Sequence, residues 1–368
     1  MICESISENS YIIATPTGAS ASLINGQTLH SVFQIPRKIS EFKALTGQKG
    51  RRLEKTFENV QYIILDEFSL IGCETLAMID LRCKQVTGNV DEDFGGLHIF
   101  LLGDIKQLPP VKMTPCYSLN AWSTLAQQGR ALFTNFDKIY ELQHCHRQEN
   151  DMKFLKVLDN ISNGFSTIED YKYLSTRFST NLTTADQESF KHAIRLFTTR
   201  EEVKAYNLKK MSNMKNEETN AFVPVVKIPG VHANKESVKG SDDDAEGLQS
   251  TLFLSEGSQI MLRSNLWVSK GLVNGTLGIV HHILYDEHQQ PSRDAPSIII
   301  CEFPTYTGPG LIPGTKLVPI KPIMKSWKGN NIVCTRTQFP IVLCYACTIH
   351  KAQGMTLDKV LLDNDFTT

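Results

Sequence analysis

The sequence predicts an α/β protein that holds a parallel sheet in its first half and a region of short strands further along. The first observation is that two unbroken apolar runs, at 62–65 and 99–102, end abruptly in acidic or amide residues. Strands of this kind are buried on both faces, as in a parallel sheet with helices on both sides. The second observation is that the pattern changes near residue 257 to short strands separated by turn residues.

The composition is that of a folded chain without a membrane span or a secretion signal. The 368 residues are 41% hydrophobic and 21% charged, with a formal net charge of −1, so two or three domains fit and no global basic field indicates nucleic acid. The first residues lack the basic and apolar regions of a signal peptide, and no apolar stretch approaches the ~18 residues of a membrane helix. We therefore expect no membrane partner.

The first 140 residues alternate strands and helices. The apolar runs at 11–15, 62–65 and 99–102 are predicted strands. After the second, Ser69 is a candidate N-cap, and Gly88 a candidate end, of a helix with one apolar face. That face would carry Leu76, Ile79, Cys83 and Val86. These elements predict an α/β layer over residues 1–140.

The following segments show helix and strand patterns in turn. A helix is expected near 150–163, ended by Gly164, with one face formed by Phe154, Leu155, Leu158 and Ile161. A strand at 193–198 precedes a helix that begins near Glu201. Residues 232–250 are polar and acidic, so we expect an exposed loop there without a core.

Short strands with turns extend from residue 257 to about 340. They are predicted at 259–262, 278–280, 298–303 and 316–320, and Asn274-Gly275 is typical of a hairpin. The apolar run 341–348 then indicates a return to the α/β pattern as one buried strand.

Nine cysteines are scattered at irregular spacing, which favours a reducing compartment over a disulfide framework. Cys344 and Cys347 form a C-x-x-C inside the last apolar run, but zinc would need a second pair, and none is near in the sequence. His144-Cys145-His146 is the other candidate for metal binding. Because buried cysteines mostly pack, we expect neither metal nor redox chemistry at these places.

Chemistry is concentrated where two predicted strands end. At the carboxyl end of a parallel strand, Asp66 can hold Mg²⁺ through water while Glu67 polarises an attacking water. Taken alone, the pair fits a helix N-terminus with two acids in the first turn equally well. In the run 103–110, Gly103 permits a close turn, and two prolines stiffen the loop that holds Gln107 near the strand edge. A strand-exit turn explains the glycine and prolines but not an amide paired with the upstream acids.

A site that hydrolyses a nucleoside triphosphate also needs a phosphate loop, G-x-x-x-x-G-K-[ST]. The sequence contains no such run and no Gly-Lys dipeptide. The residues therefore indicate a nucleotide-hydrolysing sheet in which the sequence supplies one edge but not the phosphate cradle.

Seven runs spread over nearly the whole chain resemble, in order, the signatures of the petite-integration-frequency (Pif-type) helicase family. These are superfamily-one 5′→3′ DNA helicases related to RecD and to the helicase of Helitron transposons. The matching runs are 15–21, 25–31, 63–70, 102–111, 142–148, 271–276 and 348–358. Agreement of one run by chance is plausible, but agreement of the whole set in order is not.

The resemblance implies two RecA-like parallel-sheet domains, both incomplete at the termini, with a small β-rich SH3-like insertion. The first would be 1–140, the second 141–256 with 341–368, and the insertion 257–340. It also implies an ATP- and Mg²⁺-dependent enzyme that is a monomer and acts on single-stranded DNA and duplex junctions. The resemblance favours a nuclear location, and a mitochondrial one stays open. Whether its role lies in replication, repair, telomere maintenance or transposition stays open.

Residue roles are also implied by the resemblance. Asp66 would be the Mg²⁺ partner and Glu67 the water activator, and Gln107 and Arg147 would contact the γ-phosphate, for which a planar guanidinium is suited. A surface salt bridge is the alternative for Arg147. The residues that would line the single-strand groove are Thr17, His30, Thr348, His350 and Lys351, and those that would link it to the nucleotide cleft are Gln353 and Gly354. A structural histidine is the alternative for both His30 and His350.

The sequence departs from the family at both ends. The phosphate loop is expected just before Tyr11, where only ten residues precede, and a final arginine motif is expected after Asp363, where the chain ends five residues later. Loss of a comparable arginine finger lowers the rate by about 10³–10⁵. We therefore expect a fragment that is inactive by itself. The alternative is a non-catalytic, transposon-derived relic that binds single-stranded DNA.

Overall fold

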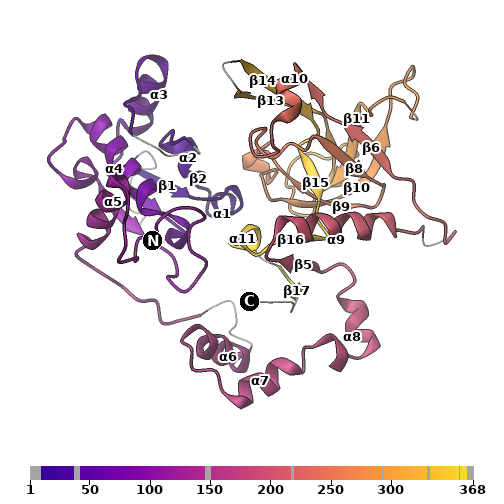
Figure 1. The fold of residues 1–368 in the computed structure, drawn as a ribbon, viewed down its shortest axis with the longest axis horizontal. Helices are drawn as coiled ribbons and strands as arrows, with labels where there is room; N and C mark the ends of the chain where they lie inside the picture. Colours follow the sequence, from indigo (N-terminus) through magenta and orange to yellow (C-terminus); the bar gives the residue numbers. More distant parts are fainter. Residues whose placement is uncertain are drawn as a thin grey trace. The chain divides into compact units, whose positions relative to one another are not determined.

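The structure is a computed structural model that describes residues 10–36, 42–145, 151–216, 219–291, 293–329, 332–355 and 357–362 (Figure 1). Contacts divide the chain into two compact units. The first unit is Met1–Pro16 with Leu29–His192, and the second unit is Thr17–Thr28 with Ala193–Thr368. The chain shows the mixed α/β content and the parallel sheets that the sequence predicts. The domain boundaries expected at 141, 257 and 341 stay predictions.

The first unit is built on parallel strands. Strands β1 (Tyr11–Thr15), β3 (Tyr62–Leu65) and β4 (His98–Leu101) lie side by side in that order, with Ile13 opposite Ile64 and Ile64 opposite Phe100. The predicted strands 11–15 and 62–65 are confirmed, and the third begins one residue earlier than expected. The central strand β3 is buried on both faces, as predicted. Phe100 in β4, by contrast, is 38% exposed and lies beside the ring of Tyr62.

Helices cover the face of these strands that carries Ile12, Ile63 and Leu65. They are α2 (Leu29–Val32), α3 (Gly47–Phe57), α4 (Cys73–Thr87) and α5 (Thr124–Thr134), with short 3₁₀ turns at η1 (Phe68–Leu70) and η2 (Asp93–Gly96). Ile12, Ile63 and Leu65 pack in one core with Leu76 and Ala126 of the helices.

The predicted boundaries of α4 are half right. Gly88 ends the helix with φ +72°, in the left-handed region that glycine adopts without a steric cost, as expected. Ser69 is not the N-cap, because it lies buried within η1 and the helix begins after Gly72. The chain makes a 3₁₀ turn first, so the helix begins later than the sequence pattern predicts.

The rest of the first unit is helical. It comprises α6 (Met152–Ser162), α7 (Ile168–Ser175), η3 (Ser179–Asn181) and α8 (Thr184–Ser189). The helix expected at 150–163 is confirmed; Asp151 caps it and Gly164 follows its end with φ +73°. Its predicted apolar face is not buried, however, because Ile161 is 46% exposed while Val157 is the residue of α6 that is buried.

The second unit contains a three-stranded parallel sheet. Its order is β16 (Ala346–Thr348), β5 (Ile194–Phe197) and β17 (Val360–Leu362), with α9 (Arg200–Ser212) packed beside it and α11 (Ile349–Ala352) after β16. Thr199 and Glu202 form a capping box at the start of α9, close to the predicted helix start. Buried Asn207 of α9 donates to the Ala346 carbonyl at 3.1 Å and accepts from the Ala346 N–H at 2.8 Å, which fixes β16 against the helix.

The remainder of the second unit is rich in antiparallel strands. A five-stranded sheet has the order β12 (Leu317–Ile320), β11 (Ile298–Glu302), β10 (Leu277–Leu284), β9 (Gln259–Leu262) and β15 (Ile341–Leu343). A three-stranded sheet joins β13 (Ile323–Lys328), β14 (Val333–Gln338) and β7 (Val231–His232), and a pair joins β6 (Val226–Pro229) and β8 (Thr251–Leu254). Shorter elements are α1 (Gly18–Leu23), β2 (Gln27–Thr28), α10 (Lys235–Lys239) and η4 (Val268–Lys270).

One strand prediction is wrong in this unit. The run 341–348 is not one strand, because β15 pairs antiparallel with β9 while β16 pairs parallel with β5, and the chain changes sheets at Cys344-Tyr345. The hairpin predicted at Asn274-Gly275 is confirmed, because β9 and β10 pair antiparallel. The two residues form a turn, closed by Thr276 N–H to the Val273 carbonyl at 3.0 Å, in a loop of more than two residues. The loop is longer because β9 ends at Leu262 and β10 begins only at Leu277.

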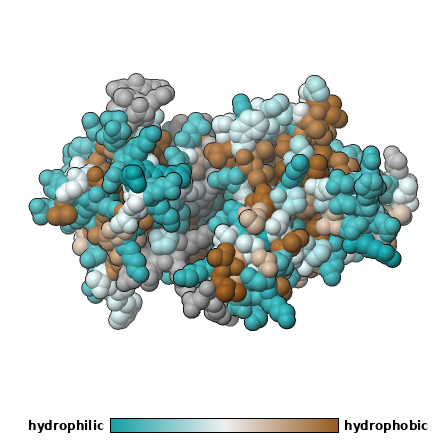
Figure 2. Space-filling model, turned by 90° about the horizontal axis from the view of Figure 1, so that it is seen from above, coloured by the Kyte–Doolittle hydropathy of each residue, from teal (hydrophilic) through white to brown (hydrophobic). Residues whose placement is uncertain are grey.

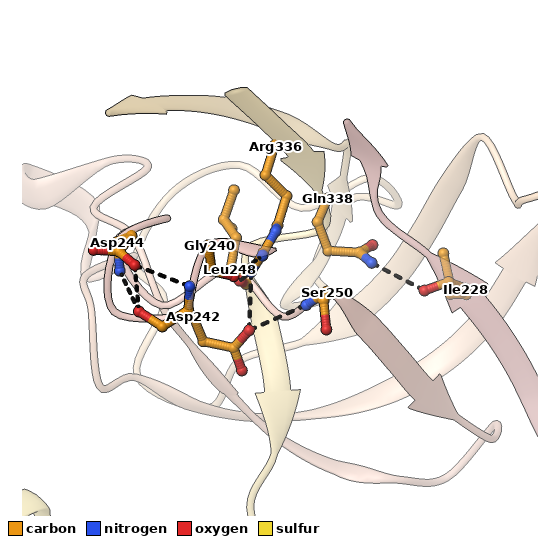
Figure 3. Close-up of polar contacts among 9 residues, drawn as sticks. Ile228, Gly240, Asp242, Asp244, Leu248, Ser250, Arg336 and Gln338 are labelled. Carbon is orange, nitrogen blue, oxygen red and sulfur yellow. Dashed lines mark hydrogen bonds and ion pairs between the residues drawn. The ribbon is translucent and has the colours of Figure 1, made fainter. Parts of the chain in front are cut away.

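The acidic segment 232–250 is not a loop without a core. Arg336 of β14 is fully buried and points into this segment (Figure 3). Its guanidinium donates to Asp242 Oδ1 at 2.9 Å and to the carbonyls of Leu248 and Gly240 at 2.7 and 2.6 Å. Because the buried cation needs these oxygen atoms, the segment folds over β14 and buries Leu248.

No helix among the described residues is long and apolar enough to cross a membrane. One face of the molecule shows hydrophilic residues interspersed with smaller hydrophobic patches (Figure 2). Apolar atoms contribute a large share of the accessible surface of ordinary folded proteins.

Candidate functional site

Asp66 and Glu67 directly follow β3, at the edge where the three parallel strands of the first unit end. The Asp66 N–H donates to the Ala14 carbonyl at 3.0 Å, and the Leu102 N–H donates to the Leu65 carbonyl at 2.8 Å. These bonds continue the strand pairing past the end of β3, so the Asp66 backbone lies between the ends of β1 and β4. The carboxyl ends of parallel strands are where α/β proteins bind ligands.

Glu67 has a strained backbone, with φ 55° and ψ 46° in the left-handed region. For a residue other than glycine this costs about 1–3 kcal/mol, and such strain gathers at functional sites. Glu67 precedes α4, which begins only at Cys73. The alternative, that Asp66 and Glu67 are acids in the first turn of the following helix, is therefore wrong. The acid in the first turn of α4 is Glu74.

Gly103 brings the run 103–110 against the run of Asp66 and Glu67. The Phe68 N–H donates to the Leu102 carbonyl at 3.0 Å, and a Cβ added at Gly103 would lie 2.8 Å from the Phe68 backbone nitrogen. Only glycine allows this approach, so the loop that carries Gln107 leaves the sheet directly beside Glu67. Gln107 itself is exposed, and its N–H donates to the Asp104 carbonyl at 3.1 Å.

The structure brings together part of the predicted nucleotide site. It joins the run of Asp66 and Glu67 to that of Gly103 and Gln107, whereas Arg147 lies outside the described residues. Among the described residues, no group of three or more histidines, cysteines or acids could hold a metal ion. Asp66 alone still fits Mg²⁺, because this ion commonly takes one or two carboxylates and fills its other positions with water and substrate phosphates.

The chain after this loop is fixed to the start of α4. The N–H and hydroxyl of Thr114 donate to the Glu74 carboxylate at 3.0 and 2.9 Å, and the Cys73 N–H donates to the Thr114 carbonyl at 2.8 Å. A hydrogen bond from Cys116 lowers the pKa of the buried Cys73 thiol and raises that of Cys116. These contacts tie the loop of Gln107 to the helix that follows Glu67.

A second group of predicted residues gathers in the second unit. Thr17 caps α1, where its hydroxyl accepts from the Ser20 N–H at 3.2 Å, and Thr348 stands at the N-cap of α11. His350 in α11 is exposed, while Lys351 is largely buried, which lowers its pKa to about 8. The charge of Arg263 adds to this lowering, whereas Cys344 and Cys347 oppose it.

Sequence reasoning missed two asparagines at this place. Lys351 Nζ donates to Asn274 Oδ1 at 3.1 Å, and the Asn274 N–H donates to Asn265 Oδ1 at 2.8 Å. A Cβ added at Gly18 would lie 3.5 Å from both Asn265 Oδ1 and the Asn274 carbonyl oxygen. Three runs far apart in sequence, those of Thr17, Asn274 and Lys351, therefore meet. The available signals were the Asn-Gly pair itself and the family-like run 271–276 that contains it.

The other predicted groove and linker residues are placed as follows. His30 lies exposed on α2 of the first unit. Gln353 and Gly354 follow α11 and are half-buried, with Gly354 at φ +76°. Cys344 and Cys347 are both buried, as expected, and a hydrogen bond between them lowers the pKa of Cys347 and raises that of Cys344.

Comparisons with known proteins agree with this arrangement. A model of the PIF1-like helicase family matches residues 2–172, and a model of the 2B domain of the DNA helicase Pif1 matches 246–283. Among curated relatives, the ATP-dependent DNA helicase PIF6 of Trypanosoma brucei brucei is 27% identical over 95% of this chain and 43% of its own length. The ATP-dependent DNA helicase PIF1 of Xenopus laevis is 28% identical over 94% of this chain and 49% of its own.

The fold matches as well. The crystal structure of Bacteroides Pif1 bound to ssDNA superimposes with a TM-score of 0.69 at 25% sequence identity, covering 100% of this chain and 79% of that one. This chain spans about half the length of the two curated relatives. The agreement of family models, relatives and fold with the joined strand ends leads to one conclusion: the chain belongs to the PIF1-like helicase family.

Proposed function

We propose that this chain is part of an ATP-dependent DNA helicase that moves 5′→3′ on single-stranded DNA and unwinds duplex junctions. The observation that carries the proposal is the joined edge of β3 and β4, where a strained Glu67 lies beside the loop of Gln107. Support comes from the relatives, which are ATP-dependent DNA helicases, and from the Bacteroides protein, which binds ssDNA.

On this proposal Asp66 and Glu67 have different roles in phosphoryl transfer. Asp66 would hold Mg²⁺ through water, and a bound ion would supply positive charge to offset that of the phosphates. Glu67 orients the attacking water, and Gln107 and Arg147 contact the γ-phosphate. Positioning and charge stabilisation account for most of the catalysis of this reaction, so small displacements of these groups have large effects on rate.

The DNA-binding side of the proposal rests on the groove residues. Hydroxyl, imidazole and ammonium groups are common contacts to a nucleic-acid backbone, and aromatic or basic grooves bind single strands without sequence preference. The residues assigned to this role are Thr17, His30, Thr348, His350 and Lys351, with Gln353 and Gly354 as the link to the nucleotide cleft.

We further propose that the 368-residue chain is inactive as an ATPase by itself. Its sequence has no Gly-Lys dipeptide and so no phosphate loop, while the groove residues are present. The same observation favours the second candidate function, a non-catalytic protein that binds single-stranded DNA.

The first test is ATP turnover by the purified chain and by Glu67→Gln, each with and without oligothymidine. We expect both proteins to remain at background, because no cradle holds the triphosphate at the edge. Turnover that single-stranded DNA stimulates, and that Glu67→Gln removes, would refute inactivity and assign the catalytic role to Glu67. Circular dichroism of both proteins shows whether they are equally folded.

A further inference from the structure

The turn of Asn274 is held rigidly at the end of β9. The Val273 N–H donates to Thr276 Oγ1 at 3.1 Å, and Thr276 Oγ1 donates to the Gly271 carbonyl at 2.9 Å. The Gly275 N–H donates to the Leu262 carbonyl at 2.9 Å. Because Thr276 is buried, these bonds form away from solvent and fix where the Asn274 side chain begins.

Asn274 makes polar contacts in two directions from this fixed turn. Its Oδ1 accepts from Lys351 Nζ at 3.1 Å, and its N–H donates to Asn265 Oδ1 at 2.8 Å. Its carbonyl oxygen lies 3.5 Å from the Cβ position of Gly18, the first residue of α1. Asn274 thus binds the lysine of α11 and lies close to Gly18 at the start of α1.

The chemistry of this contact matters because the acceptor is neutral. Lys351 is largely buried, and the titratable groups that act on its pKa are the Arg263 guanidinium and the thiols of Cys344 and Cys347. A carboxylate in place of the amide would neutralise the ammonium. The amide oxygen instead satisfies one of its protons and leaves the positive charge available to a second, anionic partner.

We propose that Asn274 is a positioning residue that holds the Lys351 ammonium, through a neutral acceptor, for a phosphate of single-stranded DNA. Asn265 in turn fixes the Asn274 backbone. This inference rests on the proposed function for its ligand. The contact between Asn274 and Lys351 is within the second unit.

The arrangement makes DNA binding depend on pH. Because burial lowers the pKa of Lys351 to about 8, the ammonium is charged below that pH and loses its proton as the pH rises through it. The contribution of Lys351 to phosphate binding is therefore present at pH 7 and lost at higher pH.

The test compares Asn274→Ala with Asn274→Asp in the full chain. The pKa of Lys351 is followed by NMR of ¹³C-labelled lysine side chains, with the signal assigned by its loss in Lys351→Met. We expect alanine to lower this pKa, because the ammonium loses its acceptor, and aspartate to raise it, because an opposite charge favours the ammonium. A pKa that is the same in all three proteins would overturn the proposal.

Binding of fluorescein-labelled oligothymidine then gives the functional readout at pH 7. Both variants are expected to bind more weakly, with a slope of log K against log salt lower by about 0.7, the value for one phosphate contact on a single strand. If Asn274 had only a structural role, the pKa of Lys351 and the affinity for oligothymidine would change in the same direction. Here Asn274→Asp raises the pKa of Lys351 but weakens binding, because its carboxylate neutralises the ammonium. Equal salt slopes in all proteins would contradict the proposal.

Failure of the proposed function gives a different result. If the wild-type chain is folded but binds no oligothymidine at any salt, the DNA-binding function fails. The phosphate part of this inference then fails with it, while the opposite pKa shifts still decide whether Asn274 positions Lys351. Thermal unfolding of both variants shows whether a weak binder is simply unfolded.

Discussion

Replacing Gly129 by alanine is expected to destabilise the first unit by about 3 kcal/mol, the upper end for overpacking a core. Gly129 of α5 is buried against the start of α4, where an added Cβ would lie 1.9 Å from the Cys73 carbonyl oxygen. The contact is with backbone, so no side chain can turn aside. The two helices must separate, which opens the core around Leu76 and Ala126.

An ordinary helix predicts the opposite sign, since alanine in place of glycine stabilises a helix by about 1 kcal/mol. Urea unfolding measures the loss, and hydrogen exchange of 73–87 and 124–134 locates it. The matched control is Gln128→Ala, an exposed change on the same helix that should stay within about 0.5 kcal/mol. A more stable Gly129→Ala protein would show that the helices do not approach as described.

Replacing Asp242 by alanine is expected to destabilise the second unit by about 3 kcal/mol. The change leaves the fully buried guanidinium of Arg336 without its counter-charge and the Ser250 N–H without its acceptor. We take the low end of the range for breaking a buried ion pair, because the Asp242 side chain is 49% exposed. Hydrogen exchange of 240–250 should rise, since Arg336 holds this segment on β14.

The neighbouring Asp243 supplies the control for this change. It pairs with Arg200 at 2.6 Å, but both side chains are more than half exposed, so Asp243→Ala should cost less than about 1 kcal/mol. Equal losses for the two variants would mean that the buried guanidinium does not hold the acidic segment. The ring of Trp327, 5.8 Å from the Arg336 guanidinium, offers a local fluorescence probe.

The sequence was sufficient where local pattern decides the structure. Apolar runs predicted β1 and β3, and glycine at position 88 predicted the end of α4, because burial and backbone conformation act over a few residues. The joined strand ends could also be predicted, since acids after one strand and a glycine after another mark the same sheet edge.

Long-range contacts decided what the sequence could not predict. The acidic segment 240–250 is held by Arg336, 94 residues from Asp242, and no local pattern reveals a buried cation. The run 341–348 is divided because its two halves find different partners, β9 and β5. Asn274 was visible as a turn residue in the run 271–276, but its partner was not, since its contact with Lys351 spans 77 residues.

The most direct test of the central claim is the affinity of the 368-residue chain for labelled oligothymidine as a function of salt. The account holds that the groove residues still bind single strands although the sequence has no phosphate loop. It predicts weak binding whose log K falls linearly as log salt rises between about 50 and 200 mM. A folded sample that does not bind, or binding that salt does not change, would contradict it.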